Sequence, residues 1–64
     1  MKNEHMALLT TVQAARLLNV HPDTLRMWRG KGRGPSWVRL GNRYRYSQEA
    51  LDDFLKASGQ EVNR

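Results

Sequence analysis

The sequence predicts a small domain that is mainly α-helical and carries one β-hairpin. Three segments place apolar residues at helical spacing, and each begins at a residue that favours a helix N-terminus. Between the second and third segments, residues 37–46 alternate between apolar or aromatic and basic side chains on either side of Gly41-Asn42, the pattern of two paired strands. With 64 residues, the chain has room for a single domain.

The first helix is expected over residues 11–18, after a short extended stretch at Leu8-Leu9. Thr10 and Gln13 are spaced as a capping box, in which the threonine hydroxyl accepts from the amide of Gln13 and the glutamine side chain reaches back. The apolar residues expected to form the buried stripe of this helix are Val12, Ala15, Leu17 and Leu18.

The second helix is expected from Pro22 to about Arg29, after a three-residue break. Proline favours the first helical position, where its missing N–H costs no hydrogen bond. Leu25 and Trp28 are three residues apart and therefore share one buried face. A glycine-rich stretch follows Arg29 and ends the helix.

The hairpin is expected to pair residues 37–40 with residues 43–46 around the Gly41-Asn42 turn. Side chains alternate between the two faces of a strand. We expect one face to carry three arginines, which are Arg39, Arg43 and Arg45. The opposite face is expected to carry Val38, Leu40, Tyr44 and Tyr46.

The last helix is expected to begin after Ser47, a good N-cap, with Glu49 in its first turn. Its expected buried stripe is Ala50, Leu51, Phe54 and Leu55. The organisation predicted for the whole chain is a flexible leader over residues 1–7, one domain over residues 8–57 and a flexible tail over residues 58–64.

The positive charge is concentrated in the middle of the chain. The net charge is +5, and residues 24–48 hold seven cations and no acid. The rest of the chain holds four cations and six acids. Such a one-sided distribution suits a polyanionic partner. The alternative is a solvated basic surface of the kind common in small domains.

Several classes of protein and site do not match this sequence. No apolar run approaches the roughly 20 residues of a membrane span, and no signal peptide is apparent. The absence of cysteine fits a reducing cytoplasm. His5 and His21 are isolated, so no metal site is expected, and His21 fits a helix cap or a base contact. Because no catalytic set or phosphate-binding loop is present, we expect neither an enzyme nor a cofactor.

The connection between the first two helices has the length found in helix-turn-helix motifs, in which the second helix enters the DNA major groove. Three residues, Asn19, Val20 and His21, separate Leu18 from Pro22. The candidate base-reading residues are His21, Thr24, Arg26 and Met27. Asp23 lies among them, and it fits either acceptance of a hydrogen bond from the amino group of cytosine or orientation of a neighbouring arginine.

The candidate phosphate-binding residues follow the early part of the second helix and continue through the hairpin, because the arginine side chain offers a planar set of donors that suits phosphate. They are Arg29, Lys31, Arg33, Arg39, Asn42, Arg43, Arg45 and Tyr46. For the hairpin arginines, the alternative is charge that protects an exposed strand from aggregation. The aromatic residues fit the core better than base stacking, although Trp37 fits either role.

Residues 9–20 resemble the opening of the excisionase-type or AlpA-type DNA-binding domains, which are relatives of the MerR regulators. Thr24 to Arg29 resembles their recognition helix. Gly34-Pro35 followed by residues 39–46 resembles their wing, and Gln48 to Leu55 resembles their last helix. The resemblance covers residues 8–57. It implies a winged helix-turn-helix fold, with the wing arginines along the DNA backbone or the adjacent minor groove.

The function implied by the resemblance is sequence-specific binding and bending of double-stranded DNA. The leading hypothesis is a phage or mobile-element excisionase, also called a recombination directionality factor, which directs an integrase toward excision. Several copies would bind cooperatively in the cytoplasm of a bacterial host, associated with the nucleoid. One alternative is a small stand-alone transcriptional regulator, and another is an interaction module for an acidic protein or RNA. Because no long dimerisation helix follows, no small-molecule effector is expected.

Overall fold

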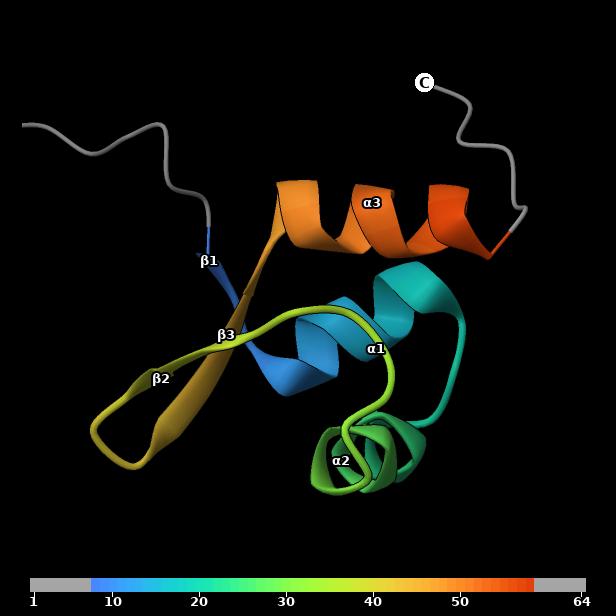
Figure 1. The fold of residues 1–64 in the computed structure, drawn as a ribbon. Helices are drawn as coiled ribbons and strands as arrows, with labels where there is room; N and C mark the ends of the chain where they lie inside the picture. The colour runs from blue at the N-terminus through green and yellow to red at the C-terminus, as the bar shows by residue number, and fades with distance from the viewer. Residues whose placement is uncertain (1–7, 59–64) are drawn as a thin grey trace, which may run out of the picture.

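The computed structural model describes residues 8–58 as three helices and three short strands (Figure 1). In chain order these are β1 (Leu8–Leu9), α1 (Thr11–Leu18), α2 (Pro22–Gly30), β2 (Val38–Leu40), β3 (Arg43–Ser47) and α3 (Gln48–Ala57). The predicted helical fold with a hairpin is confirmed. The predicted leader, and the predicted tail beyond residue 58, lie outside the described residues. None of these helices is long and apolar enough to cross a membrane.

Local hydrogen bonds set the start of α1, as predicted, and also its end. The hydroxyl of Thr10 accepts from the amide of Gln13 at 3.1 Å, and the side chain of Gln13 accepts from the amide of Thr10 at 2.9 Å. At the other end, Asn19 adopts a left-handed conformation with φ of 61° and donates its N–H to the carbonyls of Ala15 and Arg16. Asparagine tolerates this conformation better than most residues, so it closes the helix and turns the chain toward α2.

The β-hairpin runs directly into α3, without a connecting loop. Ser47 is both the last residue of β3 and the N-cap of α3, and its hydroxyl accepts from the amide of Ala50 at 3.0 Å. The predicted cap is confirmed, and this direct junction places the hairpin relative to α3.

The sheet has three strands in the order β1-β3-β2, so β3 lies in the centre. The residues of β1 pair antiparallel with the end of β3, Leu8 opposite Ser47 and Leu9 opposite Tyr46. The sequence predicted only an extended stretch at Leu8-Leu9, because two residues are too few to show a strand period. This third strand fixes the N-terminal end of the domain beside the core.

The core is small and is built from all three helices and the central strand. Its buried residues are Ala14, Ala15, Leu25, Tyr46 and Leu51. Leu9, Leu18, Val20 and Trp28 pack against it. The predicted burial of Val12 and Leu17 is wrong, since they are 44% and 54% exposed. With about 100° per residue in a helix, both lie to the sides of the face on which Ala14, Ala15 and Leu18 contact the core.

Gly34 allows the loop after α2 to pass close to Trp28. Its φ is +84°, and a β-carbon added there would lie 3.1 Å from Cε3 and 3.2 Å from Cβ of Trp28. The Trp28 ring also packs against the ring of Phe54 in α3, with centroids 5.7 Å apart. Pro35, next in the chain, is buried. The Gly34-Pro35 pair therefore closes the loop over the contact between α2 and α3.

Replacing Gly34 with alanine should destabilise the domain by about 2 kcal/mol, because a left-handed conformation costs an alanine roughly 1–2 kcal/mol and the new methyl group also displaces Trp28. For a domain of this size, that loss should lower the melting temperature by about 10 °C. Thermal unfolding followed by circular dichroism measures the change.

Gly32→Ala is the matched control for this prediction. Gly32 has a φ of +71°, but nothing lies within 4 Å of an added β-carbon. This variant should therefore lose only the conformational part of the stability. Equal melting temperatures for the two variants would show that the close approach of Gly34 to Trp28 is unimportant.

Candidate nucleic-acid interface

The outward face of α2 is open to solvent along its first two turns. Three residues, 19–21, join α1 to α2, and Leu25 anchors α2 in the core. On the opposite side, Met27 is 49% exposed, and the side chains of Arg26 and Asp23 are 50% and 78% exposed. In Figure 1, α2 lies at the bottom of the domain and is not covered by another element in that direction. The helix predicted to read bases is therefore accessible.

An ion pair on this face holds Arg26 in one orientation. Nη1 of Arg26 donates to Oδ1 of Asp23 at 2.6 Å, across one helical turn. Two roles were expected for Asp23, and this contact matches the second of them, the orientation of a neighbouring arginine. A guanidinium held by one nitrogen still presents its other donors outward.

The other predicted base-reading residues lie around the start of α2. His21 is the N-cap, and its Nδ1 accepts from the amide of Asp23 at 3.0 Å. Its ring stays largely exposed. Thr24 is half-buried, so less of its side chain is accessible than in Arg26 or Met27.

The register of the hairpin corrects the predicted distribution of its arginines. Arg39 pairs with Tyr44, whereas Val38 pairs with Arg45 and Leu40 with Arg43. Directly paired residues lie on the same face of a sheet, so Arg39 shares a face with Tyr44 and Tyr46. Arg43 and Arg45 lie on the opposite face with Val38 and Leu40. The prediction of one face carrying all three arginines is wrong.

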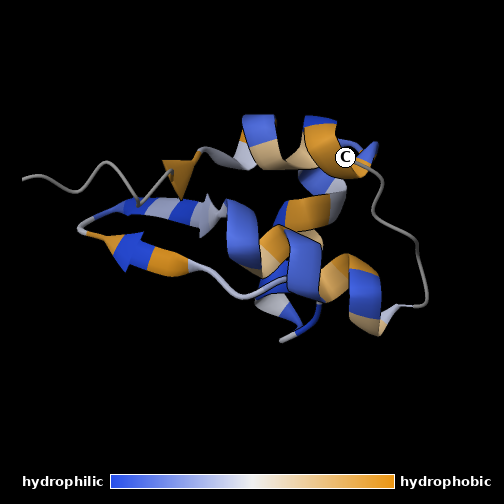
Figure 2. Ribbon diagram, turned by 90° about the horizontal axis from the view of Figure 1, so that it is seen from above, coloured by the Kyte–Doolittle hydropathy of each residue, from blue (hydrophilic) through white to orange (hydrophobic). Residues whose placement is uncertain are grey.

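The two-residue turn explains this arrangement. Gly41 has a positive φ of 64° at the first central position, as type II′ turns require, and the turn places Leu40 opposite Arg43. The side chains of Leu40 and Arg43 therefore lie on the same face of the hairpin. Within each strand, successive side chains still alternate between the two faces. In Figure 2, hydrophobic and hydrophilic residues alternate along β2, whereas along β3 strongly hydrophilic residues alternate with residues of intermediate hydropathy. Val38 and Leu40 are exposed rather than buried.

Arg29 connects α2 to α1 and to the central strand. Its Nη1 donates to the hydroxyl of Tyr46 at 2.9 Å and to the hydroxyl of Thr11 at 3.3 Å. Its guanidinium carbon lies 3.9 Å from the centre of the Tyr44 ring. The sequence predicted only a phosphate contact for Arg29. Its position four residues after the buried Leu25 could have indicated that it lies beside the core.

Tyr46 is a core residue, so the predicted phosphate contact is wrong. Its side chain is 1% exposed, and its hydroxyl accepts the hydrogen bond from Arg29. As the residue opposite Leu9 in the central strand, it is covered by the helices. The alternation of the hairpin correctly placed Tyr46 with Tyr44, but it did not show that only the end of the strand near α3 is buried.

The remaining predicted phosphate-binding residues lie at the surface of the loop after α2 and of the hairpin. Lys31, Arg33, Asn42 and Arg43 are exposed. The side chain of Arg39 is held by a hydrogen bond from Nε to the carbonyl of Gly41 at 2.9 Å, and that of Arg45 by one from Nη1 to the carbonyl of Tyr44 at 2.8 Å.

Three of the four acidic residues in the described part of the chain lie on one helix, and the fourth, Asp23, lies on α2. Glu49, Asp52 and Asp53 are on α3, which lies across the top of Figure 1, away from α2 and the hairpin tip. The surface formed by α2, the following loop and the hairpin is therefore the positive part of the domain, as the charge pattern predicted.

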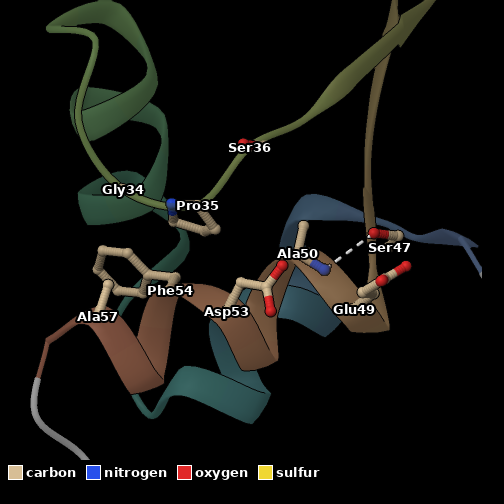
Figure 3. Close-up of a pocket in the computed structure, with 9 residues that line it drawn as sticks. All are labelled: Gly34, Pro35, Ser36, Ser47, Glu49, Ala50, Asp53, Phe54 and Ala57. Carbon is tan, nitrogen blue, oxygen red and sulfur yellow. Dashed lines mark hydrogen bonds between the residues drawn. The ribbon is translucent and has the colours of Figure 1, made fainter.

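An open groove of about 390 Å³ lies between α3 and the loop at residues 34–36 (Figure 3). Its polar lining includes Glu49 and Asp53, and its apolar lining includes Pro35 and Phe54. The acidic lining makes it unsuited to a nucleic acid. Within residues 8–58, no group of three or more potential metal ligands comes together.

Comparison with known proteins agrees with this geometry. A family model described as a helix-turn-helix domain matches residues 8–59, which is most of the chain. A search of curated proteins gave no match. The match spans both helices of the motif, the hairpin and α3. The chain belongs to this helix-turn-helix domain family, which includes the DNA-binding domains of the AlpA and excisionase type.

Proposed function

We propose that the domain binds double-stranded DNA in a sequence-specific manner, with α2 in the major groove and the hairpin against the adjacent backbone or minor groove. The observation that supports this most directly is the exposed face of α2, on which Asp23 holds the guanidinium of Arg26 in place. Helix-turn-helix domains place their second helix in the major groove, where its early residues reach base edges.

The proposed interface divides into base-reading and phosphate-binding residues. Arg26 reads a base, because an arginine can pair with the O6 and N7 atoms of guanine. His21, Thr24 and Met27 surround it and complete the contact with the bases. The phosphates are held by Arg29, Lys31, Arg33, Arg39, Asn42, Arg43 and Arg45, which lie around α2 and along the hairpin.

The proposed biological role is that of an excisionase encoded by a phage or another mobile element. Several copies bind side by side, bend the DNA and direct an integrase toward excision, in the cytoplasm of a bacterial host. The small size of the domain supports this role, since one copy covers only a short site. A transcriptional regulator would use the same surface, so the two roles are separated by experiment.

A binding assay and a recombination assay test the two levels of the proposal. Fluorescence anisotropy should show tighter binding to a duplex taken from the DNA flanking the gene than to an unrelated duplex, a single strand or RNA. Preference for RNA would contradict DNA binding. With the neighbouring integrase, the protein should stimulate excision of a reporter segment. Site-specific binding without stimulated excision would favour the regulator.

Replacing Asp23 with asparagine should raise affinity for unrelated DNA while reducing sequence preference. The change removes a negative charge from the proposed interface, which should strengthen binding to any duplex by about threefold. It also replaces the ion pair with at most a weaker neutral hydrogen bond to Arg26, so discrimination between the specific and the unrelated duplex should fall by about tenfold. Competition binding at a fixed salt concentration measures both effects.

Asp53→Asn is the matched control for Asp23. It makes the same change of charge on α3, at an exposed position in the acidic groove. Its sequence preference should equal that of the unmodified protein. If Asp23→Asn keeps full discrimination, the ion pair does not orient Arg26 for base reading.

A further inference from the structure

The ring of Tyr44 gathers side chains from α2 and from the hairpin into one cluster, here called the Tyr44 cluster. Its members are Arg29, Trp37, Arg39 and Tyr44. The guanidinium carbons of Arg29 and Arg39 lie 3.9 Å and 5.8 Å from the centre of the tyrosine ring. Trp37 meets the same ring edge to face, with centroids 5.1 Å apart. The cluster thus connects the end of α2 to the hairpin.

The two arginines of this cluster keep free donors for a ligand. A guanidinium over an aromatic ring uses its face, whereas its N–H groups point outward from its edge. Arg29 donates to protein oxygens through Nη1, and Arg39 through Nε. Among residues 8–58, the other nitrogens of both side chains make no hydrogen bond, and neither side chain pairs with a carboxylate.

Two uncompensated positive charges held near one ring favour an anion that can accept from both. The ring restricts both side chains before binding, so less conformational entropy is lost when they contact a ligand. A solvated surface would more often leave such arginines mobile and apart. The cluster lies between α2 and the hairpin. With α2 in the major groove and the hairpin beside it, the cluster would face the phosphate backbone between these two contacts.

We propose that Arg29 and Arg39 bind one continuous stretch of DNA phosphate backbone, and that Tyr44 is the positioning residue that holds them for it. This inference rests on the proposed function, because it assumes duplex DNA as the ligand. Arg43, on the opposite face of the hairpin, contacts a different stretch of backbone. Tyr44 therefore contributes to affinity through the two arginines and not through its own hydroxyl.

Coupling between Tyr44 and Arg39 tests this proposal. Tyr44→Leu should weaken binding to every duplex by about tenfold, as expected for a charged hydrogen bond lost, and should reduce the salt dependence by about one unit. Tyr44→Phe keeps the ring and should bind like the unmodified protein. In the Tyr44→Leu background, Arg39→Ala should cost clearly less affinity than it costs alone. Losses that simply add would overturn the proposal.

Arg43→Ala is the matched control in this cycle, because it also removes a hairpin arginine but from the other face. Its loss of affinity should add to that of Tyr44→Leu. Circular dichroism at the binding temperature checks that each variant is folded. If the unmodified protein fails to bind duplex DNA, the proposed function fails; if it binds and the cycle is additive, only the role of Tyr44 fails.

A second measurement does not depend on Tyr44→Leu folding. Neutral methylphosphonate groups are placed one at a time in the duplex. They should weaken binding by the unmodified protein at a few adjacent positions. Arg39→Ala and Arg29→Lys should each lose this sensitivity at the same or neighbouring positions, because lysine keeps the charge of Arg29 without its planar stack on Tyr44. Effects at separated positions would show that the two arginines bind different parts of the backbone.

Discussion

Replacing Leu25 with alanine should leave most of the protein unfolded at room temperature in the absence of DNA. Leu25 is 1% exposed and is one of the five buried residues that form the hydrophobic core of the described part of the chain. Leucine-to-alanine changes at such positions cost about 2–5 kcal/mol. The core of a domain of this size without disulfides rarely supplies more than about 3–5 kcal/mol of stability, so this single change removes most or all of it.

Far-ultraviolet circular dichroism and urea unfolding measure the effect, and Met27→Ala is the control on the same helix. Met27 points away from the core, so its replacement should change the stability by less than about 0.5 kcal/mol. Excess duplex DNA should restore part of the folded population of Leu25→Ala, because a ligand at about 100 times its Kd adds about 2.7 kcal/mol. A Leu25→Ala variant as stable as the unmodified protein would contradict the packing of α2.

The parts of the fold that depend on local chemistry could be predicted from the sequence. The capping box of Thr10 and Gln13 and the N-cap at Ser47 involve residues only three positions apart. Their hydrogen bonds form whenever the chain enters a helix there. Predicted and observed bounds of α1 therefore agree, and α2 extends one residue beyond its predicted end, to Gly30.

The parts that depend on contacts between distant segments could not be predicted in the same way. The apolar spacing of α1 did not show that Ala14 and Ala15, rather than Val12 and Leu17, face the core. This choice depends on where α2 and β3 lie. The pairing of Leu8-Leu9 with β3 likewise depends on a strand nearly forty positions away in the chain. Neither the orientation of α1 nor the pairing of β1 produces a periodic pattern of residues in the sequence.

For the candidate interface, the sequence identified the residue types but not their partners. It selected Arg29 and Tyr46 as separate phosphate contacts, whereas the structure joins them by a hydrogen bond beside the core. It treated the hairpin arginines as one group, although pairing across the two-residue turn divides them between two faces. Counting the turn residues would have predicted this division, since Leu40 and Arg43 must then be opposite each other.

Replacing Arg26 with alanine should abolish most of the sequence preference of the proposed DNA-binding domain. A bidentate contact between arginine and guanine contributes about 1–3 kcal/mol of discrimination, roughly 5- to 150-fold in affinity. Binding to the preferred duplex should fall by this factor, while binding to an unrelated duplex should fall much less. A protection footprint first locates the preferred site, and competition binding then measures both affinities.

Two further variants separate base reading from attraction by charge. Arg26→Lys keeps the positive charge but loses the planar set of donors, so it should bind unrelated DNA normally and still lose the preference. Arg43→Ala removes an exposed hairpin charge. It should weaken binding to all duplexes alike and reduce the salt dependence of binding by about one unit. If Arg26→Ala and Arg43→Ala instead change affinity and salt dependence in the same way, Arg26 acts as another backbone contact, and the base-reading residues must be sought elsewhere on α2.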